Sequence, residues 1–358
     1  MVTDLQYLTG LNLPRCQQFL RFCCITCKNN AAVSRYNPHD QRAFICIAVS
    51  AADRRADDLY CSIAQGIIWG IMALGLYITF RLLDIADLTV DGSFATGGAV
   101  AIMLITSGCP AWAALIAALL AGTAAGLCTG VLHTRLGIPA ILSGILTQFA
   151  LYSINLRIMG MSANRSANPD TFKLLITMRS VPKAILTGAV LAAAIVAVMY
   201  WYFGTEQGSA IRATGSNPNM SRAQGINTDN MKLIGLALSN GMVALSGGLM
   251  AQYQGFADVN MGRGSIVIGL AAIIIGEVLC DAAFRKGCEF YMRLLFVIVG
   301  GIVYYIVMVI ILWLKLDPND LKLFTAIIVA VFLAVPHIQA ERKSSFKMAG
   351  KRSLNGKA

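Results

Sequence analysis

The chain has 358 residues, of which 57% are hydrophobic and 13% charged, and its formal net charge is +11. Soluble domains carry roughly 25% charged residues, so this composition excludes an ordinary soluble domain and indicates a protein with many membrane-spanning segments. The basic residues lie mostly in loops and after Pro336, without a basic face of interleaved aromatic residues. We therefore expect these residues to contact anionic membrane lipid and not nucleic acid.

Residues 1–57 differ from the rest of the chain, because they are polar and basic and lack a sustained hydrophobic period. They also lack the pattern of a signal peptide, since the apolar patch 43–52 is short and charged residues follow it at once. We predict a poorly ordered extension here, with an upstream start site as an alternative origin. The pair Cys24 and Cys27 has no second pair at zinc spacing, so we expect no metal site.

Nine apolar segments follow, and they predict an all-α polytopic membrane domain over residues 58–338, with a basic cytoplasmic tail at 339–358. A bilayer-spanning helix needs about 20 residues, and most segments are long enough. The segments that begin at Ser93 and Ser265 are short and follow polar, glycine-bearing stretches, which is typical of discontinuous helices in inverted repeats. The segments are Cys61–Phe80, Ser93–Thr106, Ala111–His133, Ile138–Met159, Pro182–Phe203, Met231–Gln252, Ser265–Leu279, Phe290–Leu314 and Leu321–Val335.

The two short segments are preceded by similar sequences, which favours an internal repeat. Residues 85–91 parallel residues 256–262, and Asp87 aligns with Asp258 at an offset of 171 residues. Ionisable side chains at membrane depth are costly and usually functional, so these carboxylates are candidates to line a translocation path. The alternative is that they fix the geometry of the broken helices. With the polar residues two positions further on, the path candidates are Asp87, Thr89, Asp258 and Asn260.

Other polar and small residues near these segments have structural interpretations. We expect Asp91 to cap the first short helix, and Glu277, near the inner face, to be a snorkelling or paired carboxylate. Gln148 lies in mid-span, where an unpaired amide is costly, so we expect it to bond a neighbouring helix. The glycine steps 122–126 and 126–130 predict close packing of helices.

A polar loop over residues 205–230 separates two apolar segments. Asn217 suits an N-cap and Pro218 the first helical position, and Gly225 ends the small-residue run that follows. This pattern predicts a helix of one to two turns at the membrane surface, which another protein could grip. With this loop inside the cell, fourteen basic residues after residue 57 fall on the inner side and eight on the outer side, which supports that orientation. Nine crossings would place residues 1–57 outside, and their seven basic residues would remove this bias, so either the extension is absent from the mature chain or the number of crossings differs by one.

Two stretches of the chain resemble one family of transport proteins. The segment Gly75–Gly98, GLYITFRLLDIADLTVDGSFATGG, and the loop Ile211–Asp229, IRATGSNPNMSRAQGINTD, are similar to the branched-chain amino acid/ribose permeases of ATP-binding-cassette importers. The resemblance runs from about Cys61 to Val335. It implies a type II importer fold in a bacterial plasma membrane. Within this family the chain looks most like an uncharacterised branch of importers, some members of which are linked to uptake of aromatic amino acids.

The resemblance also implies a set of partners. These are two ATPase subunits, an extracellular or periplasmic solute-binding protein and a second permease copy, as a homodimer or a pair of related chains. ATP and Mg would be bound by the ATPase and not by this chain. The loop would contact the ATPase through Gly215, Asn217, Pro218, Met220, Ala223 and Gly225.

Catalytic motifs do not occur in the sequence. The three histidines are isolated, and HExxH, GxSxG and phosphate-loop patterns are absent, so ATP-driven transport would need a separate ATPase chain. We therefore expect a transport subunit and not an enzyme. Two alternatives stay open: a stand-alone secondary carrier, in which Asp87 and Asp258 would bind coupling ions, and, with less support, a membrane-embedded enzyme.

Overall fold

The computed structural model describes residues 41–167, 172, 174–284, 289–313 and 330. The chain divides into two units, Met1–Asp57 and Asp58–Ala358. Of the first unit, residues 41–57 are described, and they are helical, while the rest of the predicted extension lies outside the described residues. The predicted tail at 339–358 also lies outside them.

The described part of the chain is almost entirely helical, as the sequence predicts. A short antiparallel pair of strands, β1 and β2, is the exception, and it joins Asn164 to Asp258 and Ser166 to Phe256. The elements are α2 (Gln41–Tyr77), η1 (Ile78–Leu82), α3 (Val90–Thr106), α4 (Ala111–Thr134), α5 (Ala140–Ile158), β1 (Asn164–Ser166), η2 (Met178–Ser180), α6 (Val181–Gly204), α7 (Glu206–Ser216), α8 (Pro218–Ala223), α9 (Thr228–Gln254), β2 (Phe256–Asp258), α10 (Ser265–Ala283) and α11 (Phe290–Trp313).

Seven described helices are long and apolar enough to cross a membrane. The shorter apolar helix α3 matches the first predicted short segment. The first eight predicted segments all fall on helices of the structure, whereas Leu321–Val335, apart from residue 330, lies outside the described residues. The chain is thus a multi-pass membrane protein, and the total of about nine spans stays a prediction.

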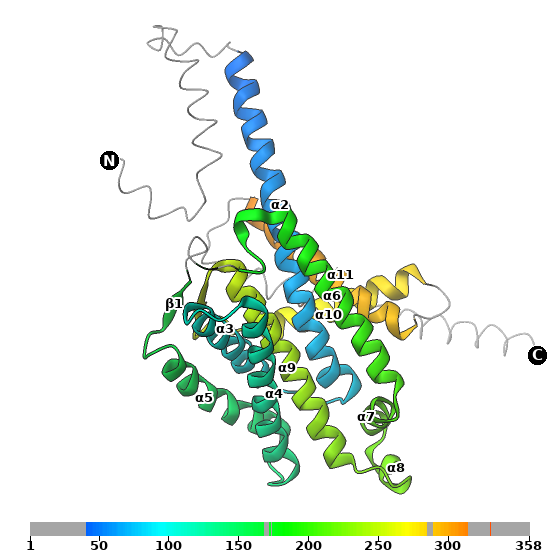
Figure 1. Cartoon of the computed structure of the whole chain (residues 1–358). Coiled ribbons are helices and arrows are strands. Elements are labelled where there is room, and N and C mark those ends of the chain that lie inside the picture. Colours follow the sequence, from blue (N-terminus) through cyan, green and yellow to red (C-terminus); the bar gives the residue numbers. More distant parts are fainter. Residues whose placement is uncertain (1–40, 168–171, 173, 285–288, 314–329, 331–358) are drawn as a thin grey trace, which may run out of the picture. The chain divides into compact units, whose positions relative to one another are not determined.

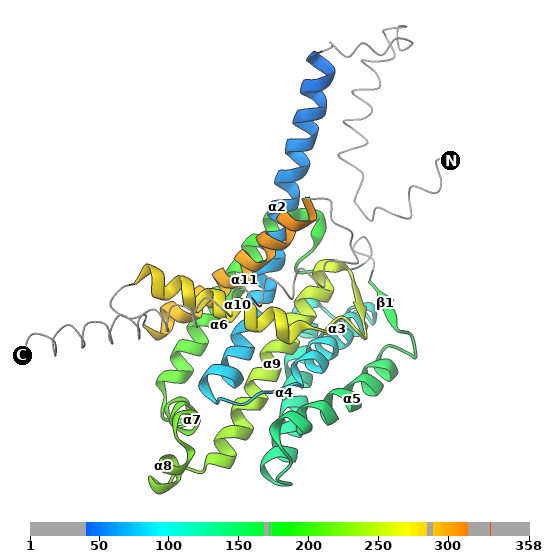
Figure 2. The ribbon, with the colours of Figure 1, turned by 180° about the vertical axis from the view of Figure 1, so that it is seen from behind.

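Two helices form the centre of the bundle. The apolar stretches Asp58–Leu82 and Thr228–Gln254 are 83% and 72% buried, against 28–39% for the other five membrane-length helices. Figures 1 and 2 both show α9 between α2 and α4. The hydroxyls of Ser239 and Ser246 on α9 donate to the carbonyls of Gly75 and Ile68 on α2, each at 2.7 Å. The two central helices therefore run antiparallel and are joined by side-chain to backbone hydrogen bonds.

Helix α9 packs against α3 and α4 through glycines. A Cβ on Gly97 of α3 would overlap the carbonyl oxygen of Ala244, and a Cβ on Gly247 of α9 would overlap that of Phe94. On α4, Gly122 and Gly126 face the backbone of α9 in the same way, so the predicted packing role of this glycine pattern is confirmed. Only residues without a side chain allow this approach, and it brings the polar groups of α3 and α9 within bonding distance.

Glycines also allow close backbone contacts with α11, from α10 and from the other central helix, α2. A Cβ on Gly276 of α10 would overlap the carbonyl oxygen of Phe296 on α11, and a Cβ on Gly66 of α2 would lie 2.6 Å from Cα of Ile302. Helix α9 therefore packs on α3 and α4, and α2 packs on α11, which contacts α10. Each central helix thus packs on helices of the other half of the chain, since α2 precedes α3 and α4, and α9 precedes α10 and α11. This arrangement agrees with two related halves, although the inverted repeat itself stays a prediction.

The Gly97→Ala variant should be destabilised, because its Cβ would press against Ala244 in a contact between two backbones. Overpacking of this kind typically costs about 1–3 kcal/mol. The matched control is Gly204→Ala, since a Cβ there meets nothing within 4 Å. We expect a lower midpoint of thermal denaturation in detergent for Gly97→Ala and an unchanged one for Gly204→Ala. Equal midpoints would contradict the close approach of α3 and α9.

Candidate functional site

The segment that leads into α3 carries a buried carboxylate. Asp87 is 4% exposed, and its Oδ1 accepts the N–H of Thr89 at 2.9 Å. Its Oδ2 accepts the side-chain amide of Asn240 on α9 at 2.7 Å. The oxygen of the same amide accepts the hydroxyl of Ser93 at 2.7 Å. Asp87 and Asn240 thus join the start of α3 to the middle of α9, and the side chains of both are hydrogen-bonded, as buried polar groups require.

A chain of three hydroxyls extends this polar cluster to α4 and α5. Thr89 and Thr129 are joined at 2.8 Å, and Thr129 donates to Thr147 at 3.0 Å. Gly144 allows α5 to close over the cluster, because a Cβ there would lie 2.8 Å from the backbone nitrogen of Leu88. In this conformation the path candidates Asp87 and Thr89 are therefore sealed among four helices, where they hold the start of α3 in place.

The two other path candidates repeat the local geometry of the first two. Asp258 Oδ1 accepts the N–H of Asn260 at 2.6 Å, just as Asp87 accepts that of Thr89. Each aspartate therefore closes a turn on the residue two positions later, at a break that precedes a helix. Asn260 is exposed, whereas Thr89 is buried. The two breaks share their turn and differ in their access to solvent.

Asp91 caps a helix, but not the one that the sequence suggests. It lies in the first turn of α3, whose N-cap residue Thr89 makes no side-chain capping bond. Its carboxylate accepts the N–H groups of Gly264 and Ile266 and the hydroxyl of Ser265. The capped helix is therefore α10, from the other half of the chain. Local spacing could not reveal this, because the carboxylate and the helix are separated by more than 170 residues.

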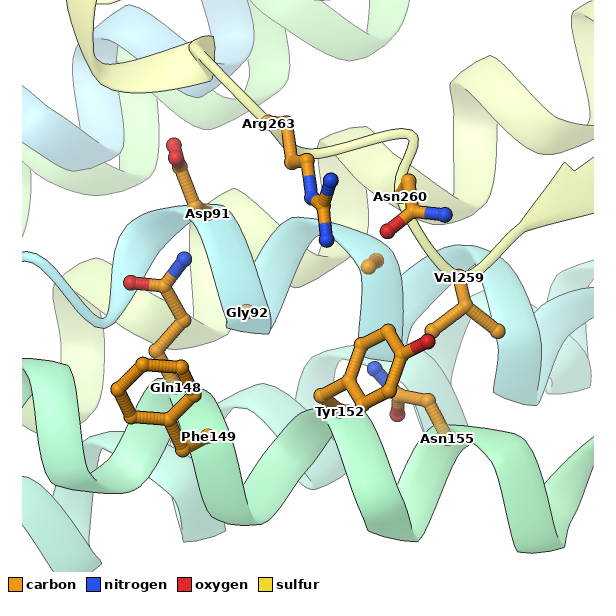
Figure 3. A pocket seen from close by; sticks show the side chains of 10 residues that line it. Asp91, Gly92, Gln148, Phe149, Tyr152, Asn155, Val259, Asn260 and Arg263 are labelled. Atoms are coloured by element: carbon orange, nitrogen blue, oxygen red, sulfur yellow. The ribbon is translucent and has the colours of Figure 1, made fainter. Parts of the chain in front are cut away.

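A pocket of about 360 Å³ lies beside this junction, between α3, α5 and the loop from β2 to α10. In Figure 3, Arg263 points from the loop toward α5, while Gln148, Tyr152 and Asn155 point from α5 toward α3 and the loop. Its ten lining residues are Asp91, Gly92, Ala95, Gln148, Phe149, Tyr152, Asn155, Val259, Asn260 and Arg263. Of the four predicted path residues, the pocket thus includes Asn260.

Most of this pocket was not predicted from the sequence. Gln148, Tyr152 and Asn155 are spaced i, i+4 and i+7, so they share one face of α5. That spacing is the signal that could have found them. Gln148, expected to bond a neighbouring helix, lies in the pocket wall instead. The place of Arg263 in the pocket could be found only from the tertiary structure, because the fold of a distant loop brings this residue to α5.

The predicted surface helix in the 205–230 loop is confirmed as α8. Asn217 is its N-cap and accepts the N–H of Met220 at 3.1 Å, and Pro218 occupies its first position. Gly225 follows with a φ of 84°, which glycine adopts at no steric cost. Met220 is 61% exposed, and Pro218 and Ala223 are also exposed. The helix therefore presents most of the predicted contact residues to the surroundings of the chain.

The loop is joined to the membrane helices at two points. Arg222 donates to the hydroxyl of Thr228 at 2.8 Å and pairs with Asp229 at 3.4 Å, at the start of α9. A Cβ on Gly215 of α7 would overlap the carbonyl oxygen of Leu82 at the end of η1. Gly215 thus packs against the protein's own body, whereas the exposed residues of α8 are free to contact another chain.

A second cavity and an ion pair lie at the η1 joint. The cavity has a volume of about 370 Å³, and its walls include Arg212 and Gly215 as well as residues of η1. Within η1, Arg81 pairs with Glu277 of α10 at 2.8 Å, so the expected pairing of Glu277 is confirmed. This π-helical segment is therefore in contact with the loop on one side and with α10 on the other.

No group of three or more metal-ligating side chains occurs in the part of the chain that the structure describes. The residues that line the two cavities offer hydrogen bonding, ion pairing and apolar contact. These interactions can bind a small molecule or another protein reversibly.

Replacing Asp91 with alanine should loosen the start of α10, because three donors lose their acceptor. Unsatisfied donors of this kind cost about 1–3 kcal/mol. Hydrogen exchange followed by mass spectrometry should show faster exchange over residues 262–268. Asp281→Ala, an exposed change near the other end of α10, is the control and should leave this exchange unchanged. Equal protection in both variants would show that the cap does not hold this helix.

Comparisons of the sequence with known proteins identify a family. The family described as "Branched-chain amino acid transport system / permease component" matches residues 60–336. A "Tyrosine transport system permease protein" of Clostridioides difficile (strain R20291) is 39% identical over 281 residues, which is 78% of this chain and 92% of that protein. An uncharacterized protein of Rickettsia prowazekii (strain Madrid E) is 32% identical over 188 residues, covering 52% of this chain and 65% of its own length. No solved structure gives a significant match. The chain therefore belongs to the family of branched-chain amino acid transport permeases.

Proposed function

We propose that this chain is the membrane-spanning subunit of an ATP-binding-cassette importer for an amino acid, driven by ATP hydrolysis in separate subunits. The observation that carries the proposal is α8, a capped, exposed helix in the loop that joins the membrane-length helices α6 and α9. Family membership and similarity to a protein named as a tyrosine permease support it. Tyrosine and related aromatic amino acids are therefore the first solutes to test.

Transmission of force would begin at α8. An ATPase that holds the exposed face around Met220 moves the loop as one body, because Asn217 and Pro218 fix the start of the short helix. The movement reaches α9 through Arg222 and η1 through Gly215. Both elements lead to the Asp87–Asn240 bond, so a shift of the loop changes how α3 meets α9. ATP binding would thereby favour one of two conformations of the bundle.

The proposal specifies the other components. Two ATPase subunits bind ATP and Mg, a solute-binding protein delivers the amino acid from outside, and a second copy of this chain completes the path. The assembly lies in a bacterial plasma membrane with the 205–230 loop on the cytoplasmic side. This chain contributes binding and movement but no covalent step.

The Met220→Asp variant should lose its ATPase partner, because a charge replaces an exposed apolar side chain at the proposed contact. The tagged chain would be captured from gently solubilised native membranes, and co-purifying ATPase activity would be measured. We expect at least a tenfold loss, equivalent to about 1.4 kcal/mol of binding free energy. The matched control is Met161→Asp, which changes another exposed methionine, 74% exposed, outside the loop.

The outcomes separate the possible functions. Capture of an ATPase by the wild-type chain and by Met161→Asp, with loss in Met220→Asp, supports the importer and its coupling helix together. If the folded wild-type chain captures no ATPase and still carries solute into vesicles without ATP, the chain is a secondary carrier. Equal capture of the ATPase by both variants would show that the coupling contact does not depend on Met220.

A further inference from the structure

We propose that the 360 Å³ pocket between α3, α5 and the β2–α10 loop is a solute subsite, which holds a small carboxylate-bearing molecule with a flat apolar side chain during transport. An aromatic amino acid fits this description. The inference rests on the proposed function, since it names where the permease itself would contact its solute.

Asn155 gives the main reason to assign a ligand to this pocket. Its side chain is 1% exposed, yet neither its amide nitrogen nor its amide oxygen has a hydrogen-bond partner among the described residues. Buried polar groups in folded proteins are nearly always bonded, so an amide with two unused atoms needs an explanation. A solute with both a donor and an acceptor, such as an α-amino acid, satisfies both atoms at once.

Arg263 supplies the charge that such a solute requires. Its guanidinium points toward α5 across the pocket (Figure 3), and it forms no ion pair within the part of the chain that is described. The nearby carboxylate of Asp91 is already engaged by Gly264, Ser265 and Ile266. A guanidinium binds a carboxylate through two parallel hydrogen bonds, so Arg263 is suited to the carboxylate end of an amino acid.

The remaining wall and the size of the pocket indicate the other end of the solute. Phe149 and Tyr152 contribute aromatic rings, and their side chains are 71% and 42% exposed. Rings of this kind favour stacked or edge-on contact with another aromatic group. Ligand pockets range from about 300 to 1,000 Å³, so a cavity of 360 Å³ suits a molecule of amino-acid size.

The pocket also lies where movement of the bundle would change it. Asp91 joins the first turn of α3 to the start of α10, and α3 and the loop that leads into α10 both form walls of the pocket. Helix α3 follows η1, which contacts the cytoplasmic loop through Leu82 and Gly215. A shift of the loop would therefore alter the distance between Arg263 and α5. A site whose affinity changes with conformation is what directed transport requires.

Uptake into vesicles tests the subsite. Vesicles would contain the complex captured from native membranes, with its ATPase and binding protein, and the probes would be labelled L-tyrosine, L-phenylalanine and L-leucine. Asn155→Leu and Arg263→Gln should lower ATP-dependent uptake of the aromatic probes by about tenfold, the size of effect expected from one lost charge-assisted or buried hydrogen bond. Arg157→Gln, which removes an exposed cation of α5 outside the pocket, should transport as the wild type does.

The thermal stability of Asn155→Leu distinguishes a ligand-binding role of the amide from a structural one. Because the Asn155 amide has no partner in the described protein, Asn155→Leu should raise or leave unchanged the midpoint of thermal denaturation. A clearly lower midpoint would show that the amide serves the fold and would overturn the proposal. Wild-type uptake by both pocket variants would also overturn it.

The pattern of results distinguishes the two proposals. If the wild-type complex transports an aromatic probe and the pocket variants do so equally well, the importer proposal is supported and the subsite proposal is overturned. If the wild-type complex transports no probe although the ATPase is present, the proposed amino-acid solute is wrong, and the subsite falls with it. Reduced uptake in both pocket variants, with ATPase capture retained, supports both proposals.

Discussion

The helices α3 and α10 each begin after a break in the chain, and the N–H groups at a helix start need acceptors from outside that helix. Aspartates supply acceptors at both breaks. Asp87 and Asp258 close the turns that precede the two helices, and Asp91 of the first helix caps the second. The glycine contacts of α9, the sealed polar cluster and the pocket all depend on these starts being held in place.

Features set by neighbouring residues could be predicted from the sequence. The N-cap at Asn217, the proline after it and the positive φ of Gly225 depend on local preferences, so α8 was correctly expected. Eight apolar segments were found for the same reason, because hydrophobicity is a property of each stretch. The alignment of Asp87 with Asp258 in the two similar sequences could also be predicted, and in the structure each aspartate closes the same kind of turn.

Features that join distant parts of the chain could not be predicted in this way. Asp91 was correctly expected to cap a helix, but the helix is α10, since only the tertiary fold brings Ser265 to its carboxylate. Arg263 and Asn155 are brought to one pocket by a loop and a helix that follow different spans. The glycines of α4 indicated close packing but not its partner. Residue chemistry thus indicated that Asp91 caps a helix and that the α4 glycines pack closely, but not which elements they contact.

The three threonines that link α3, α4 and α5 have a mechanical consequence. Thr129 lies 3.3 Å from the carbonyl of Ala125 on its own helix, and Thr147 donates to that of Ser143 at 3.0 Å. A hydroxyl rotates about one bond and both donates and accepts, so Thr129 and Thr147 can each bond a carbonyl of its own helix when a neighbour on another helix moves away. Helices α4 and α5 can therefore shift relative to each other while both hydroxyls stay hydrogen-bonded.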